Sequence, residues 1–183
     1  MMYELPTSLV ICGVTYEIRS DYRAVLDICT ALSDVELSDQ ERSLAALNIM
    51  YPDFEDMPVE HYAEAIKKCF WFIDCGSEED QTRKAQKLMD WEQDFQYIIA
   101  PINRIIGAEI RAMDYLHWWS FISAYYEIGD CTFAMIVRIR DKKARGKPLD
   151  KQEQEWYNRN RHMVDFKRSY TETEKDTLKV WGA

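Results

Sequence analysis

The stretch DYLHWWSFISAYYEI, residues 114–128, decides how the rest of this chain must fold. One face of the helix that it predicts carries four bulky residues at helical spacing: Tyr115, Trp119, Ile122 and Tyr126. Further apolar residues widen this face until only a narrow polar wedge, which includes His117, is left for water. A helix that is apolar over most of its circumference is buried. We therefore expect it to be central to a core or an interface, with Trp119, Ile122 and Tyr126 buried.

The residues before this helix predict one small β element and then helices. Residues 8–19 are rich in β-branched side chains, and Gly13 divides them, which indicates a β-hairpin or a bent strand. Ser20 is the expected cap of a helix over 21–33, and the capping box that begins at Ser38 opens a second helix. A third helix runs from Pro58 to Gly76, with an apolar face made of Val59, Tyr62, Ala63, Ile66, Phe70 and Ile73.

The remaining residues also predict helices. Residues 89–107 have a helical pattern that Pro101 interrupts, so we expect either a kink or a new helix that begins there. Asp130 is the expected cap of the next helix, and residues 150–168 predict a long polar one. The whole reads as one mostly α domain over residues 1–183, a compact fold of six or more helices with a small N-terminal β-hairpin. Its other expected features are a flexible connection over 76–88 and a loosely held tail over 170–183.

The charge is unevenly distributed. The net charge of −9 disfavours non-specific binding to nucleic acid or to an anionic membrane. Residues 1–60 hold twelve acidic and three basic residues, whereas residues 138–148 hold six basic residues and one acidic residue. Opposite charges at the two ends are suited to attract each other, within one chain or between copies.

The cysteines and the N-terminus both favour a cytoplasmic protein. Five cysteines, without a C-x-x-C pair, are typical of reduced and mostly buried thiols rather than a disulfide framework. The N-terminus lacks the basic and apolar regions of a signal peptide, and no apolar run has the length of a membrane span.

Catalytic and metal-binding patterns are missing from the sequence. The three histidines lie far apart, and only Asp114–His117 approaches the Glu-x-x-His pattern of di-iron bundles, once and with Asp in place of Glu. No nucleophile elbow, dinucleotide fingerprint or P-loop occurs. Alternating acids at 90–94 suit a helix start better than acid–base chemistry. We expect no enzymatic activity and no cofactor or metal.

Two segments are candidates for binding a partner. The aromatic block at 115–126 is suited to a core or to a partner groove, because aromatic residues dominate both settings. The basic segment at 138–148 is suited to docking an acidic protein, to a solvated helix end or, less well in so acidic a chain, to nucleic acid. The candidate partner-binding residues are Tyr115, Trp118, Trp119, Tyr126, Arg138, Arg140, Lys142, Lys143, Arg145 and Lys147.

Five stretches resemble the bacteriophage gene-product-fifteen family, small proteins encoded by tailed phages and prophages of Gram-positive bacteria. They are YEIRSDYR (16–23), LSDQERSLAALNIMYPD (37–53), MDWEQDFQYI (89–98), YLHWWSFISAYYEIGDCTFAMIVRIRDKKARGK (115–147) and EWYNRNR (155–161). They span nearly the whole chain in family order, and the block at 115–147 is the most specific.

The resemblance implies a role in tail morphogenesis rather than a chemistry. Genes of this family typically lie between those for the major tail protein and the tape-measure protein of siphophages. That position implies a tail assembly chaperone in the host cytoplasm, which binds the tape-measure protein and other tail assembly proteins and is able to form a homo-oligomer. The alternative is a structural tail or neck adaptor of the virion. The family brings no catalytic residues to this sequence.

Overall fold

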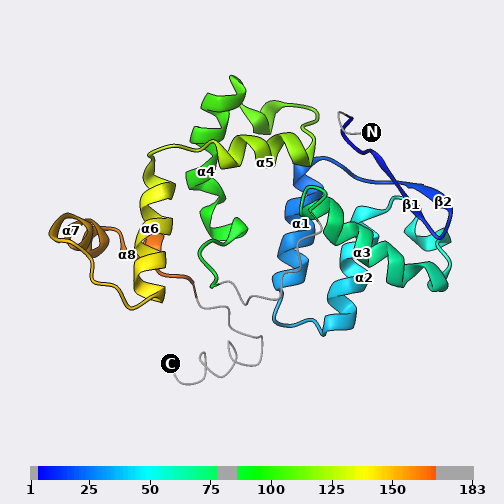
Figure 1. Cartoon of the computed structure of the whole chain (residues 1–183), viewed down its shortest axis with the longest axis horizontal. Helices are drawn as coiled ribbons and strands as arrows, with labels where there is room; N and C mark the ends of the chain where they lie inside the picture. The colour runs from blue at the N-terminus through cyan, green and yellow to red at the C-terminus, as the bar shows by residue number, and fades with distance from the viewer. Residues whose placement is uncertain (1–3, 78–85, 168–183) are drawn as a thin grey trace, which may run out of the picture. The chain divides into compact units, whose positions relative to one another are not determined.

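The computed structural model of the chain describes residues 4–77 and 86–167 (Figure 1). It is mostly helical, with eight α-helices and an N-terminal two-stranded hairpin in these residues, which confirms the predicted fold class. Most of the predicted connection at 76–88 and all of the predicted tail at 170–183 lie outside the described residues.

The described residues form two compact units. The N-terminal unit is the described part of Met1–Glu78 with His117–Trp119, and the C-terminal unit is the described part of Glu79–Leu116 with Ser120–Lys167. The expectation of one domain over residues 1–183 stays a prediction, because packing alone does not say whether a unit folds independently.

The N-terminal unit begins with the predicted hairpin. Strands β1 (Ser8–Ile11) and β2 (Val14–Glu17) pair antiparallel, with Ile11 opposite Val14 next to the turn. The two turn residues both have positive φ, 50° at Cys12 and 81° at Gly13, as a two-residue turn of type I′ requires. Glycine adopts this conformation without steric cost, whereas Cys12 is held there by its amide, which donates to a Glu64 carboxylate oxygen at 3.0 Å.

Three helices complete the N-terminal unit, and their starts follow local capping chemistry. The helices are α1 (Tyr22–Ser33), α2 (Asp39–Met50) and α3 (Tyr62–Ile73), with α2 packed against both others. The predicted capping box at Ser38 is present in full. The prediction that Ser20 caps α1 is wrong, because the carboxylate of Asp21 accepts the hydrogen bond from the Arg23 amide instead.

The buried face of α3 differs from the predicted one. Ala65, Cys69 and Phe72 are buried, whereas the side chains of Val59 and Phe70 are 71% and 43% exposed. Helix α3 itself carries apolar residues on most of its sides, so the spacing of these residues did not single out one face. In addition, Val59 belongs to a preceding 3₁₀ helix, Val59–His61, whose tighter winding puts it out of phase with α3.

The C-terminal unit contains most of the remaining helices. Helix α4 runs unbroken through Pro101, so the sequence's alternative of a new helix at that residue does not occur. Cys131, and not Asp130, caps α6, and the last predicted helix is divided at Asn160. The helices are α4 (Trp91–Ile106), α5 (Trp118–Tyr126, whose first two residues belong to the N-terminal unit), α6 (Thr132–Ala144), α7 (Lys151–Arg159) and α8 (Arg161–Val164).

The aromatic helix α5 buries a different face from the predicted one. It begins at Trp118, so Tyr115 lies outside it and is half exposed. Ile122 is buried as predicted and Trp119 is partly buried. Tyr126 is 77% exposed, so it does not belong to the core of the chain, and its burial against another copy stays a prediction. Trp118 and Phe121 are buried instead. Aromatic residues occur all around this helix, so its neighbours, rather than its own spacing, select the buried face.

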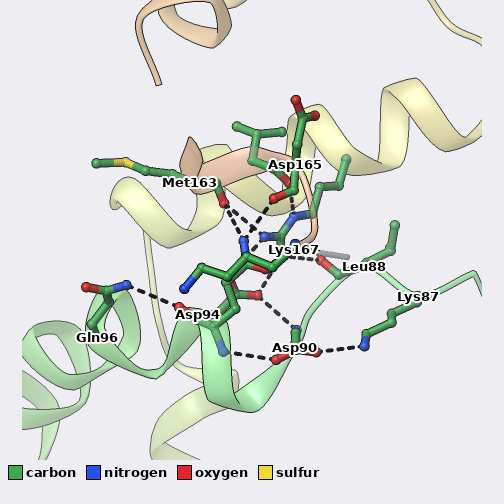
Figure 2. A network of polar contacts seen from close by, with 11 residues as sticks. Lys87, Leu88, Asp90, Asp94, Gln96, Met163, Asp165 and Lys167 are labelled. Carbon is green, nitrogen blue, oxygen red and sulfur yellow. Dashed lines mark hydrogen bonds and ion pairs between the residues drawn. The ribbon is translucent and has the colours of Figure 1, made fainter. Parts of the chain in front are cut away.

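A buried ion pair organises the C-terminal unit. The guanidinium of Arg140 on α6 donates two hydrogen bonds to the carboxylate of Asp94 on α4, at 2.5 and 3.0 Å. The two side chains are 4% and 0% exposed. The other three guanidinium donors reach the backbone carbonyls of Leu88, Met163 and Val164, so all five N–H groups have partners. Figure 2 shows how this network draws three separate segments together.

A second set of contacts attaches residues 165–167, the end of the described chain, to α4 and α6 beside the ion pair. The side-chain amide of Gln93 donates to the carbonyl of Asp165 at 3.0 Å and accepts from the amide of Lys167 at 2.9 Å. The guanidinium carbon of Arg140 lies 4.1 Å from the centroid of the Phe166 ring. The ring covers the guanidinium and restricts the access of water to the ion pair. Residues 163–167 are therefore attached to α4 and α6 at several points.

Replacing Arg140 with Met is expected to lower the free energy of unfolding of the chain by about 3–5 kcal/mol, because the buried carboxylate of Asp94 is left without its partner. Urea unfolding measures the loss. The Arg140→Met/Asp94→Leu double variant should recover part of it.

The matched control for this variant is Arg145→Met. Arg145 directly follows α6, the helix that carries Arg140, and pairs with Asp141, but its side chain is 57% exposed. An exposed pair of this kind contributes about 0–1 kcal/mol. Equal losses in the two variants would contradict the organising role of the buried pair.

Candidate partner-binding surface

The structure places two of the ten candidate residues inside the chain. Trp118 is 2% exposed, and its indole N–H donates to the carbonyl of Ile73 at 2.8 Å. Arg140 is 4% exposed and belongs to the buried ion pair. Neither side chain presents a surface to a partner in this conformation.

The basic segment neutralises most of its charge within the C-terminal unit. Lys142 pairs with Glu153 at 2.5 Å, and Lys143 pairs with Asp165 at 2.6 Å. The remaining contacts are Arg145 with Asp141 at 2.7 Å and Arg138 with Asp130 at 4.0 Å. Lys147 makes no ion pair within the part of the chain that the structure describes. The segment is therefore chiefly an anchor for α7, α8 and the residues after them.

The pair of Lys143 and Asp165 changes the ionisation of both groups. Partial burial acts to raise the pKa of Asp165, but hydrogen bonds from Lys143 and Tyr157 outweigh it and hold that pKa below its usual value. Partial burial likewise acts to lower the pKa of Lys143, and the bonds to Asp165 and Tyr157 raise it on balance. Both groups therefore favour their charged forms in the folded chain.

The start of α5 caps the end of α3 with two indoles. The Trp119 indole N–H donates to the carbonyl of Phe72 at 2.9 Å, next to the bond from Trp118 to Ile73. The last carbonyls of a helix have no partner within it. Here both indoles donate to them, and the carbonyl of Phe72 also accepts the backbone amide of Cys75 at 3.1 Å. Both indole rings are thus fixed in position.

His117 links the N-terminal segment, at Pro6, to the start of α5. Its Nδ1 accepts the amide N–H of Trp119 at 3.0 Å, which leaves the Nε2 proton to donate to the carbonyl of Pro6, also at 3.0 Å. The side chain is 3% exposed, so the expectation that it lies on a water-facing wedge is wrong. Because His117 comes before the helix, the wedge pattern did not apply to it.

These contacts frame an open pocket of about 560 Å³ in the N-terminal unit. Trp71 and Trp119 form an aromatic wall, with ring centroids 5.7 Å apart at an interplanar angle of 63°. A side chain at Gly76 would place its Cβ 3.3 Å from both rings, and the backbone there has a φ of 81°, so glycine is required. The pocket is lined by residues 4–8, Trp71, Cys75, Gly76 and Trp119.

Sequence reasoning found only part of this pocket. It named Trp119 but missed Trp71 and residues 4–8, which approach it from distant positions in the chain. The spacing of Trp71 and Gly76 at the end of a predicted helix was the only local signal. Tyr115 and Tyr126, the other exposed aromatic candidates, do not line it.

Neither a metal centre nor a membrane helix is found in the described part of the chain. Residues 4–77 and 86–167 hold no cluster of three His, Cys, Asp or Glu side chains arranged to bind a metal ion. Every helix in them falls short of the length and apolarity needed to span a bilayer. What the described geometry offers is a recess of the N-terminal unit with an aromatic wall.

Comparison with known families identifies the chain. Residues 1–166 match the family model described as Bacteriophage Gp15 protein. The chain belongs to this family. The Gp15 proteins are phage structural and assembly proteins and are not an enzyme family, and the match confirms the resemblance seen in the sequence. Searches of the curated proteins and of the solved structures found no match to the chain.

Trp118→Phe is expected to destabilise the chain by about 1–3 kcal/mol, because the partly buried carbonyl of Ile73 loses its indole donor. Chemical unfolding followed by circular dichroism measures this. Trp156→Phe is the matched control, since Trp156 is partly buried and makes no indole hydrogen bond to a described residue. Equal losses in the two variants would argue against indole capping.

Asp165→Asn is expected to reduce stability at neutral pH by up to about 1 kcal/mol, since the carboxylate is 47% exposed and its pair is screened by water. The pKa of Asp165 is depressed in the folded chain, so its contribution is present above the unfolded value of about 3.9 and is lost as the pH falls through the lower folded value. Unfolding at pH 7 and pH 3 should show the difference shrink. Asp114→Asn is the exposed control, and a constant difference would refute the pairing.

Proposed function

We propose that this protein is a tail assembly chaperone that binds the tape-measure protein in the host cytoplasm during phage tail morphogenesis. Membership of the bacteriophage Gp15 protein family carries the proposal. The described fold supports it, because the N-terminal unit holds a pocket with an aromatic wall, and aromatic residues contribute most to the binding energy of protein interfaces.

The charge distribution supports a partner that meets the N-terminal unit. Residues 4–77 hold fourteen acidic and five basic residues, a net charge of −9, whereas residues 86–167 hold twelve acidic and thirteen basic residues, a net charge of +1. The acidic surface therefore lacks compensation in its own part of the chain. Because the basic segment uses its charges locally, attraction between copies through that segment contributes less than the sequence suggested.

Co-expression with the tape-measure protein should yield a stable complex by affinity purification, and phage that lack this gene should fail to build full-length tails. Trp119→Phe, which keeps an aromatic ring but lacks the indole donor, should weaken the complex more than Trp156→Phe. Recovery of no complex, together with normal tails in the deletion phage, would reject the chaperone function.

The alternative function, a structural tail or neck adaptor, makes the opposite prediction about the virion. A chaperone leaves before the particle is complete, whereas an adaptor remains in it. Mass spectrometry of purified virions should therefore find the major tail protein but not this chain. Its presence at a fixed ratio to other tail proteins would favour the adaptor.

A further inference from the structure

The pocket at Trp71 and Trp119 combines two chemically different walls. Its apolar lining residues include Trp71, Trp119, Leu5 and Pro6. Its polar lining residues include Glu4, Thr7 and Ser8, which carry a carboxylate and two hydroxyl groups able to accept hydrogen bonds. Among the described residues, no Lys or Arg lines it. Arginine and lysine side chains have the matching form, an apolar stem that ends in a charged group that donates hydrogen bonds.

The rings themselves attract cations. The face of an indole ring is negative, and tryptophan is the best aromatic partner for an ammonium or guanidinium group. Trp71 already has one such neighbour, since the Lys68 ammonium lies 5.9 Å from its ring centroid. A second cation would therefore meet chiefly the ring of Trp119 and the carboxylate of Glu4.

The wall is also preorganised, which favours binding. The indole N–H of Trp119 donates to the carbonyl of Phe72. The buried ring of Phe72 stacks against the indole ring of Trp119, with the two ring centroids 6.0 Å apart. His117 holds the carbonyl of Pro6 on the opposite segment. A rigid pocket loses little conformational entropy when a side chain enters it.

We propose that this pocket receives an arginine or lysine side chain from the protein partner that the chain binds during assembly. The inference rests on the proposed function for the identity of the partner only. Its chemistry follows from the aromatic wall, the carboxylate of Glu4 and the net charge of −9 on residues 4–77. The volume of about 560 Å³ accommodates a whole basic side chain together with part of its neighbours.

The test uses N-acetyl-arginine methylamide as a probe and N-acetyl-citrulline methylamide, its neutral isostere, as the control ligand. Both are titrated into the full chain labelled with ¹⁵N at the indoles. Single Trp→Phe variants assign the signals. The arginine probe should shift the signals of Trp71 and Trp119 and leave Trp156 unchanged, with millimolar affinity, whereas the citrulline probe should shift none of them.

Glu4→Gln removes the carboxylate and keeps the shape, so it should weaken binding of the arginine probe by about three- to fivefold. Glu55→Gln is the matched control, because Glu55 is an exposed acid of the same unit that does not line the pocket. An unchanged affinity in the Glu55→Gln variant would support a local effect of Glu4. Equal weakening in both variants would overturn the proposal, because only the overall charge would then matter.

Two further results would also overturn it. Equal shifts with both probes would mean that the pocket takes a neutral group. Self-association of the wild-type chain that Glu4→Gln abolishes, measured by sedimentation, would identify a second copy as the occupant. The titration does not require the tape-measure protein, so failure of the complex with a successful titration would reject only the proposed function.

Discussion

The guanidinium of Arg140 is the interaction on which the C-terminal unit depends. It joins α6 to α4 through Asp94, to the segment before α4 through Leu88, and to the end of the described chain through Met163 and Val164. Burying two charges is costly, and full use of all five donors offsets that cost. Once Arg140 is in place, the positions of α4, α6 and residues 163–167 follow.

The N-terminal unit uses neutral contacts for a comparable purpose. Residues 117–119 come from a distant part of the sequence and satisfy the end of α3, while His117 holds the N-terminal segment. The same contacts that complete the packing position the aromatic wall of the pocket. Stability and the candidate binding surface therefore have one structural origin.

The charges of the chain divide in the same way. The basic residues of α6 serve the internal structure of the C-terminal unit, whereas the acids of residues 4–77 mostly lie on exposed loops and helix ends. A partner that binds the N-terminal unit would therefore meet an acidic surface with an aromatic recess. Such complementarity directs association and selects partners of opposite charge.

The sequence by itself determined the local features. The hairpin at Gly13 and the capping box at Ser38 follow from residues close together in the chain, and the structure confirms them. The family followed from the stretches at 16–23, 37–53, 89–98, 115–147 and 155–161, and the match over residues 1–166 confirms it.

Tertiary structure alone decided which faces are buried and which charges are paired. Helices α3 and α5 carry apolar residues on most sides, so only the neighbouring elements select Phe72 and Phe121 over Phe70 and Tyr126. Arg140 looks like its basic neighbours in the sequence, yet its own side chain is buried, and it meets a buried carboxylate 46 residues away. The physical reason is that helical spacing fixes where a side chain points, whereas burial depends on what the rest of the chain places opposite it.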